Sequence, residues 1–159
     1  MDEKTTSRVA AALGRIPSGC FILTTGGDGD ATAMLASWVQ QASFDPPAIT
    51  AAVRKGRHAE RVVDATGHFV LNLVGEDPGP MFKHFGKGFG PGEEAFTGLN
   101  VERREAGVVL ADCPVHLACK VTAKHDAGDH WLYLAEVLGA DGDATAKPYV
   151  HLRKNGLSY

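Results

Sequence analysis

Residues 33–47, AMLASWVQQASFDPP, carry the most information about the fold of this chain. The apolar run at 33–36 is typical of a β-strand. Ser37 interrupts this run, two glutamines follow Trp38, and the consecutive prolines Pro46 and Pro47 end the stretch. The stretch therefore predicts a strand that breaks into a polar elbow and stops at the double proline.

The segments on either side of this stretch predict a mainly β protein with short helices. Strands are expected at residues 20–25, 31–37, 48–53, 68–74, 114–124 and 130–138, and helices at 7–13, 56–65 and 78–85. A cap formed by residues 5–7 is expected to precede the first helix. Many short strands with few helices favour a barrel or a sandwich. No linker or repeat divides residues 1–159, so a single domain is predicted.

The chain has the charge and hydrophobicity of an ordinary globular protein. Its 16 basic and 19 acidic side chains give a net charge of −3, and hydrophobic residues make up 44%. This balance gives no support to a nucleic-acid partner. No apolar run reaches the ~18 residues that a membrane helix requires, and the start of the chain shows no secretory signal. We therefore expect a cytoplasmic protein that does not enter membranes.

The cysteines and histidines do not form a metal-binding pattern. Cys20, Cys113 and Cys119 include no C-x-x-C pair and are interpreted as core residues. His125 and His130 are close in sequence, but an expected hairpin turn separates them and their spacing matches no strong ligand pattern. No metal site is therefore predicted.

Six short motifs resemble those of a known family and follow in the same order. They are MLASW at 34–38, FVLN at 69–72, KHF at 83–85, FGPGE at 89–93, GDHWL at 128–132 and HLRK at 151–154. Over nearly the whole chain they resemble the flavin reductase-like split-barrel family, and most closely the reductase module at the C-terminus of diflavin flavodiiron proteins. Any one motif is weak evidence, whereas six in the same order are specific.

This resemblance implies a closed six-stranded antiparallel Greek-key split β-barrel of the FMN-binding type. It also implies a homodimer with FMN, or alternatively FAD, bound near the subunit boundary, and NADH or NADPH as the electron donor. The sequence carries no flavodoxin or di-iron portion. Its electron acceptor is therefore expected to be a separate molecule, such as an oxygenase or a flavodiiron protein.

The elbow supplies the first predicted cofactor contacts, because its main chain and hydroxyl can meet the polar edge of a flavin ring. By resemblance, the contacts on this side of the cofactor are Leu35, Ala36, Ser37 and Trp38, with Ala52 and Val53 from the next strand. The alternative is that Met34 and Trp38 are simply core residues of a strand.

A basic cluster follows the strand at 48–53. It consists of Arg54, Lys55, Arg57 and His58 and stands where the next helix is expected to begin. Cations and free backbone N–H groups would meet there, which predicts a phosphate site with Arg57 and His58 as its main residues. The alternative is a solvated basic helix start, although cations at that end are unfavourable unless an anion compensates them.

Asn72, His130 and a glycine-rich loop complete the predicted site. Asn72 lies in an apolar strand, where an unpaired amide costs roughly 1–3 kcal/mol, so it must bind either the cofactor or a neighbouring backbone group.

His130 belongs to a Gly-Asp-His motif that the family places beside the flavin and the nicotinamide, and it is the predicted catalytic residue. The alternative is a turn histidine. Lys87, within the loop at 86–92, and Lys83, just before it, are candidate contacts for a nicotinamide phosphate.

The predicted function is NAD(P)H-dependent flavin reduction with delivery of the electrons to a partner. Hydride transfer requires two rings held at close range rather than a protein acid or base, so positioning residues are expected. The alternative is a non-enzymatic FMN-binding electron carrier that has no productive nicotinamide site. A third interpretation is a cofactor-free binding module, and the polar residues that would be costly to bury in a degenerate site disfavour it.

Overall fold

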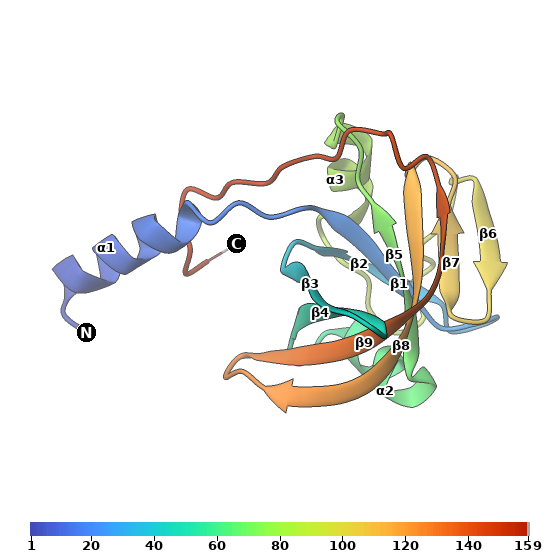
Figure 1. Cartoon of the computed structure of the whole chain (residues 1–159), viewed down its shortest axis with the longest axis horizontal. Coiled ribbons are helices and arrows are strands. Elements are labelled where there is room, and N and C mark those ends of the chain that lie inside the picture. Colours follow the sequence, from blue (N-terminus) through green and yellow to red (C-terminus); the bar gives the residue numbers. More distant parts are fainter. Residues whose placement is uncertain (159) are drawn as a thin grey trace.

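The computed structural model describes residues 1–158 (Figure 1). The helices are α1 (Glu3–Gly14), α2 (His58–Thr66) and α3 (Gly79–Phe85), and the strands are β1 (Phe21–Thr25), β2 (Thr32–Ala36), β3 (Val39–Phe44), β4 (Pro47–Arg54), β5 (His68–Leu73), β6 (Val101–Arg104), β7 (Gly107–Leu110), β8 (Val115–Asp126) and β9 (His130–Gly142). Tyr159, the last residue of the predicted domain, lies outside the described residues.

The strands form an antiparallel, mainly β structure, which confirms the predicted split-barrel fold class. The main sheet has the order β2-β1-β5-β8-β9-β4-β3, and β6 and β7 form a separate two-stranded sheet. The main sheet has seven strands rather than the expected six, because the chain after the elbow continues as β3. The hairpin of β6 and β7 was not predicted either.

The first and last strands of the sheet order, β2 and β3, are consecutive in the chain. Only Ser37 and Trp38 lie between them, so the curled sheet returns on itself at this elbow. The sheet order ends at β2 on one side and β3 on the other, so the barrel is split along this line and not closed as expected. We call this line the seam. The Ala52 N–H donates to the Trp38 carbonyl at 2.9 Å, which ties the elbow to β4.

Two clusters of buried side chains stabilise the barrel. One lies inside the main sheet and includes Phe69, Leu71 and Tyr133. The other packs α3 and β7 against β1 and β2 and includes Phe85 and Leu110. Both clusters border the seam, so the walls around it are held by packing on two sides.

Helix α2 begins directly after β4 and stands at the end of the seam. Its apolar residues Ala59, Val62 and Val63 are buried, which confirms the predicted amphipathic helix, and Gly67 ends it with a φ of 70°. Arg57 is the N-cap and supplies no side-chain hydrogen bond to the helix. The first backbone N–H groups of α2 are therefore without a side-chain cap.

Helix α1 projects away from the barrel together with the C-terminal segment (Figure 1). The Asp2 carboxylate caps it by accepting from the Thr5 N–H at 2.8 Å, so the predicted cap at residues 5–7 is wrong. The Gly156 N–H donates to the Ala10 carbonyl at 2.8 Å, so the last residues run beside the helix. We call α1 and residues 148–158 the arm.

Candidate functional site

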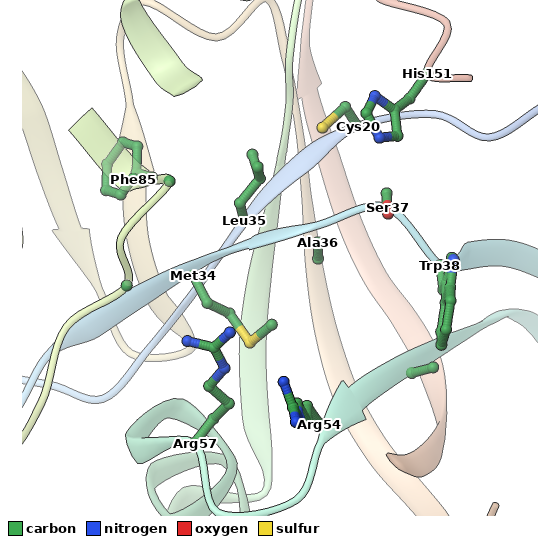
Figure 2. Close-up of a pocket in the computed structure, with 13 residues that line it drawn as sticks. Cys20, Met34, Leu35, Ala36, Ser37, Trp38, Arg54, Arg57, Phe85 and His151 are labelled. Carbon is green, nitrogen blue, oxygen red and sulfur yellow. The ribbon is translucent and has the colours of Figure 1, made fainter. Parts of the chain in front are cut away.

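A pocket of about 170 Å³ lies at the seam, between β2, the elbow, β4 and α3 (Figure 2). The predicted residues that line it are Leu35, Ala36, Ser37, Trp38, Ala52, Arg54 and Arg57. Residues that the sequence analysis did not assign to it are Cys20, Met34, Phe85, Gly86, Gly88 and His151. The structure thus brings the elbow and the basic cluster, which are separate in sequence, to one cavity.

The pocket has an apolar wall and a basic end. Met34, Leu35 and Phe85 supply aliphatic and aromatic surface, and Figure 2 shows Arg54 and Arg57 together at one end. Within residues 1–158, neither guanidinium lies within 4.0 Å of a carboxylate. Arg54 acts on the Asp129 carboxylate at longer range and contributes to lowering its pKa. Two cations without a close salt bridge beside a helix N-terminus form a site suited to a phosphate.

A second cavity, of about 440 Å³, adjoins the pocket, and Trp38 and Arg54 line both. His130 lies in it with its ring centroid 4.7 Å from that of Trp38. The His130 Nδ1 is 2.7 Å from the Asp129 carboxylate, and this hydrogen bond holds the pKa of Asp129 below its usual value. The carboxylate stays ionised and fixes the orientation of the imidazole. The guanidinium of Arg153 lies over Trp38, 4.8 Å from the ring centroid.

His58 lies at the start of α2, outside the pocket. It lines a neighbouring groove that also contains Arg57 and Gly88. Its Nδ1 is buried and has no hydrogen-bond partner in the described part of the chain. A buried ring nitrogen without a partner is costly, so a bound group is a natural partner for it.

The structure does not bring Asn72 to the pocket. Its side chain is fully buried, and its Nδ2 donates to the carbonyls of Ile22 and Val108, both at 3.1 Å. Its Oδ1 accepts from the Leu110 N–H at 2.8 Å. The prediction of a cofactor contact is therefore corrected: a neighbouring backbone group, the alternative, is the partner that the structure provides.

Val53 and Lys55 also point elsewhere. Val53 is 1% exposed and packs in the core inside the main sheet. The Lys55 Nζ is 2.7 Å from the Asp126 carboxylate and 4.2 Å from the Trp131 ring centroid, on the side of the β8–β9 hairpin. The structure therefore places neither side chain in the lining of the pocket.

His151 is the most informative residue that the sequence analysis did not assign to the site. It reaches the pocket because the C-terminal segment pairs with Ser18 through two backbone hydrogen bonds, of 2.7 and 3.1 Å. Its Nδ1 is buried without a partner among residues 1–158, and burial, together with Arg153, lowers its pKa. His151 thus offers a neutral imidazole to the pocket. The motif at 151–154 was a signal, but only the folded chain places it here.

Cys20 is a neutral wall residue of the same pocket. Burial raises the pKa of its thiol to about 11, so the thiolate is not available as a nucleophile near neutral pH. Within the described residues no group of three histidine, cysteine, aspartate or glutamate side chains comes together to hold a metal ion.

Comparison with known proteins identifies the family. The sequence profile described as "Flavin reductase like domain" matches residues 13–156. The chain belongs to this family. A curated relative, "Diflavin flavoprotein A 1" of Synechocystis sp. (strain ATCC 27184 / PCC 6803 / Kazusa), is 38% identical over 156 residues, which are 96% of this chain and 27% of the relative. The flavin reductase-like chain thus spans about a quarter of the length of that relative.

Solved structures of flavin reductases share the fold. The NADH:FAD oxidoreductase SgcE6 of Streptomyces globisporus C-1027 has a TM-score of 0.86 and 20% identity over 97% of this chain and 92% of that chain. The flavin reductase PheA2 has a TM-score of 0.77 and 20% identity over 96% of this chain and 94% of that chain. At 20% identity these structures show the fold, and the family match over residues 13–156 makes the chain a flavin reductase-like oxidoreductase domain. No described helix is long and apolar enough to cross a membrane.

The residues present fit a flavin. A flavin combines a flat ring with polar edges and a phosphorylated chain, and the site offers an apolar wall, an orphaned ring nitrogen on His151 and the unpaired cations Arg54 and Arg57. Small-molecule sites measure about 300–1,000 Å³, whereas the pocket measures about 170 Å³. Trp38 and Arg54 line both this pocket and the second cavity, so the two adjoining spaces together offer more room for a flavin than the pocket alone.

Proposed function

We propose that this chain is an NAD(P)H-dependent flavin reductase that binds FMN at the seam and passes the electrons to a partner. The observation that carries the proposal is the pocket itself, in which an apolar wall ends at two arginines that form no salt bridge with the described residues. When bound, a flavin supplies the redox chemistry by accepting a hydride from reduced nicotinamide and releasing electrons to an acceptor.

The protein's own residues bind and orient in this proposal. Arg54, Arg57 and the uncapped N–H groups of α2 hold the phosphate. Met34 and Phe85 exclude water from one side of the ring site. The elbow presents its main chain to the polar edge of the ring.

His130 is assigned to the nicotinamide side. It lines the cavity next to the pocket and packs against Trp38, so it would touch the nicotinamide and shape its approach. Asp129 holds the Nδ1 proton of the imidazole in place. We expect this residue to set geometry and local charge, because the reaction requires close alignment of two rings more than proton transfer.

The arm supports a homodimer. Helix α1 buries only Gly14 among its residues, and an isolated helix of about 12 residues is marginal in water. Large apolar side chains are exposed along the arm and the residues that lead into it: Ile16 61%, Val150 59%, Leu152 52% and Leu157 50%. A second copy of this chain would cover that surface and stabilise α1.

The electron acceptor is proposed to be a separate protein of the oxygenase or flavodiiron type. Similarity to one part of a diflavin flavoprotein supports the flavodiiron choice. The cytoplasmic location remains a prediction from the sequence.

The decisive experiment is an anaerobic titration of the purified protein, loaded with FMN, first with NADH and then with NADPH, followed by the visible spectrum. Rapid bleaching by either nicotinamide supports the reductase and names its donor. Bound flavin that bleaches with dithionite but with neither nicotinamide favours the electron carrier instead. If the protein binds no flavin, both functions are refuted.

A further inference from the structure

A groove of about 290 Å³ runs from the basic end of the pocket between the start of α2 and the glycine-rich loop. Arg57 and Gly88 line both spaces, so the groove continues the pocket. The loop backbone approaches Arg57 closely, since a Cβ placed on Gly88, whose φ is +72°, would lie 3.0 Å from its guanidinium. A ligand that reaches the arginines from the pocket therefore has a path into the groove.

The groove is basic and its cations are unpaired. Arg57, Arg61 and Lys87 line it, and none of them lies within 4.0 Å of a carboxylate in the described residues. Glu93 is the one carboxylate in the lining, and its Oε2 accepts from the Gly90 N–H at 2.7 Å. Three cations against one engaged carboxylate leave a net positive surface, which attracts an anion.

The start of α2, beside the groove, carries polar groups without side-chain partners. The N-terminal N–H groups of α2 have no side-chain cap, and the buried Nδ1 of His58 has no partner in residues 1–158. Phe89 and Pro91 form an apolar border of the same groove. Donors and cations beside an apolar border match a phosphoryl group that is attached to a larger organic group.

We propose that this groove binds a further phosphoryl group of a nucleotide that is bound at the seam, beyond the phosphate held by Arg54 and Arg57. The proposal rests on the proposed function, because the pocket must first hold the flavin. Two nucleotides carry such a group: FAD has a diphosphate where FMN has a single phosphate, and NADPH has a 2′-phosphate that NADH lacks. In both cases Arg61 and Lys87 determine specificity without touching the reacting rings.

The test compares the wild-type protein with Arg61→Ala, Lys87→Ala and the control Lys120→Ala. Lys120 is an exposed lysine of β8 that lines neither the pocket, the second cavity nor the groove. Dissociation constants for FMN and FAD are measured by quenching of flavin fluorescence. KM values for NADH and NADPH are measured with FMN as the flavin under anaerobic conditions.

We expect Arg61→Ala and Lys87→Ala each to raise the dissociation constant for FAD or the KM for NADPH by about fivefold, the upper range for an exposed ion pair. The constant for the matching nucleotide without the extra phosphoryl group, FMN or NADH, should stay unchanged. Weaker FAD binding with unchanged FMN binding identifies the diphosphate. A raised KM for NADPH with an unchanged KM for NADH identifies the 2′-phosphate. Lys120→Ala leaves all four constants at the wild-type values.

The proposal is overturned if the constants for FMN and FAD change by the same factor and those for NADH and NADPH do too. It is also overturned if Arg61→Ala and Lys87→Ala behave as Lys120→Ala does. These outcomes differ from a failure of the proposed function itself. In that case the wild-type protein binds neither flavin, or neither nicotinamide reduces the flavin it binds.

Discussion

Replacement of Asn72 by alanine tests whether this amide is structural or contacts the cofactor. The wild-type side chain is fully buried and makes three hydrogen bonds with main-chain groups of β1 and β7. Because β7 is not part of the main sheet, this amide is one of the links that hold the β6–β7 hairpin against the barrel. We therefore expect Asn72→Ala to lower the free energy of unfolding and to leave flavin affinity unchanged.

The magnitude follows from which backbone groups lose their partners. The Val108 carbonyl keeps the Thr24 hydroxyl, which donates to it at 2.6 Å. The Leu110 N–H loses the Asn72 Oδ1, and a buried donor left unpaired costs about 1–3 kcal/mol. Loss of the two hydrogen bonds that the Asn72 Nδ2 donates, to the Ile22 and Val108 carbonyls, adds about 0.5–1.5 kcal/mol each to this cost. We expect a total of about 3 kcal/mol, which is a shift of the melting temperature of about 10 °C for a chain of this size.

Urea unfolding of the flavin-free protein, followed by tryptophan fluorescence, measures this effect without stabilisation by ligand. The matched control is Asn100→Ala at an exposed position, which we expect to change stability by no more than about 0.5 kcal/mol. The dissociation constant for FMN is measured on both variants below their unfolding transitions. The reasoning is refuted if Asn72→Ala weakens FMN binding tenfold while unfolding changes by less than about 1 kcal/mol.

Three further predictions address the pocket, the arm and the buried histidine. Arg57→Ala should weaken FMN binding about tenfold through loss of a charge-assisted hydrogen bond; riboflavin, which has no phosphate, should bind as to wild type, and an equal loss for both would contradict the phosphate role. Ile16→Asp with Leu152→Asp should convert a dimer into a monomer in sedimentation experiments; a double variant that keeps the wild-type mass would exclude the arm from the interface. The His151 pKa is lowered from an ordinary value of 6.5, so the unfolded chain binds the proton more readily and stability falls as the pH drops below that value. His151→Phe should therefore lose less in melting temperature than wild type between pH 7.5 and pH 5.5, and an equal loss in both would contradict the assignment.

The elbow and the barrel could be predicted because their signals are local. An apolar strand that breaks at Ser37 and stops at a double proline is visible within residues 33–47. The place of His151 could not be predicted in the same way. It reaches the pocket only because the C-terminal segment returns to pair with Ser18, a contact that no short-range pattern encodes. The partner of Asn72 was ambiguous for the same reason, since the unpredicted strand β7 supplies it.

Val53 and Lys55 were predicted to contact the cofactor but do not line the pocket, and for Val53 the reason is contained in the sequence. Side chains alternate between the two faces of a strand, so a contiguous run at the end of β4 cannot face one cavity as a whole. Ala52 and Arg54 line the pocket, whereas Val53, between them, enters the core. Lys55 lies beyond the end of the strand and turns to Asp126. Alternation of side chains along the predicted strand at 48–53, continued to residue 54, assigns Ala52 and Arg54 to one face and Val53 to the other. It therefore predicts that Val53 does not share a cavity with its two neighbours. The same alternation explains why the seam presents both an apolar wall and a cation: one face of β4 packs the barrel, and the other, which ends at Arg54, is left for a ligand.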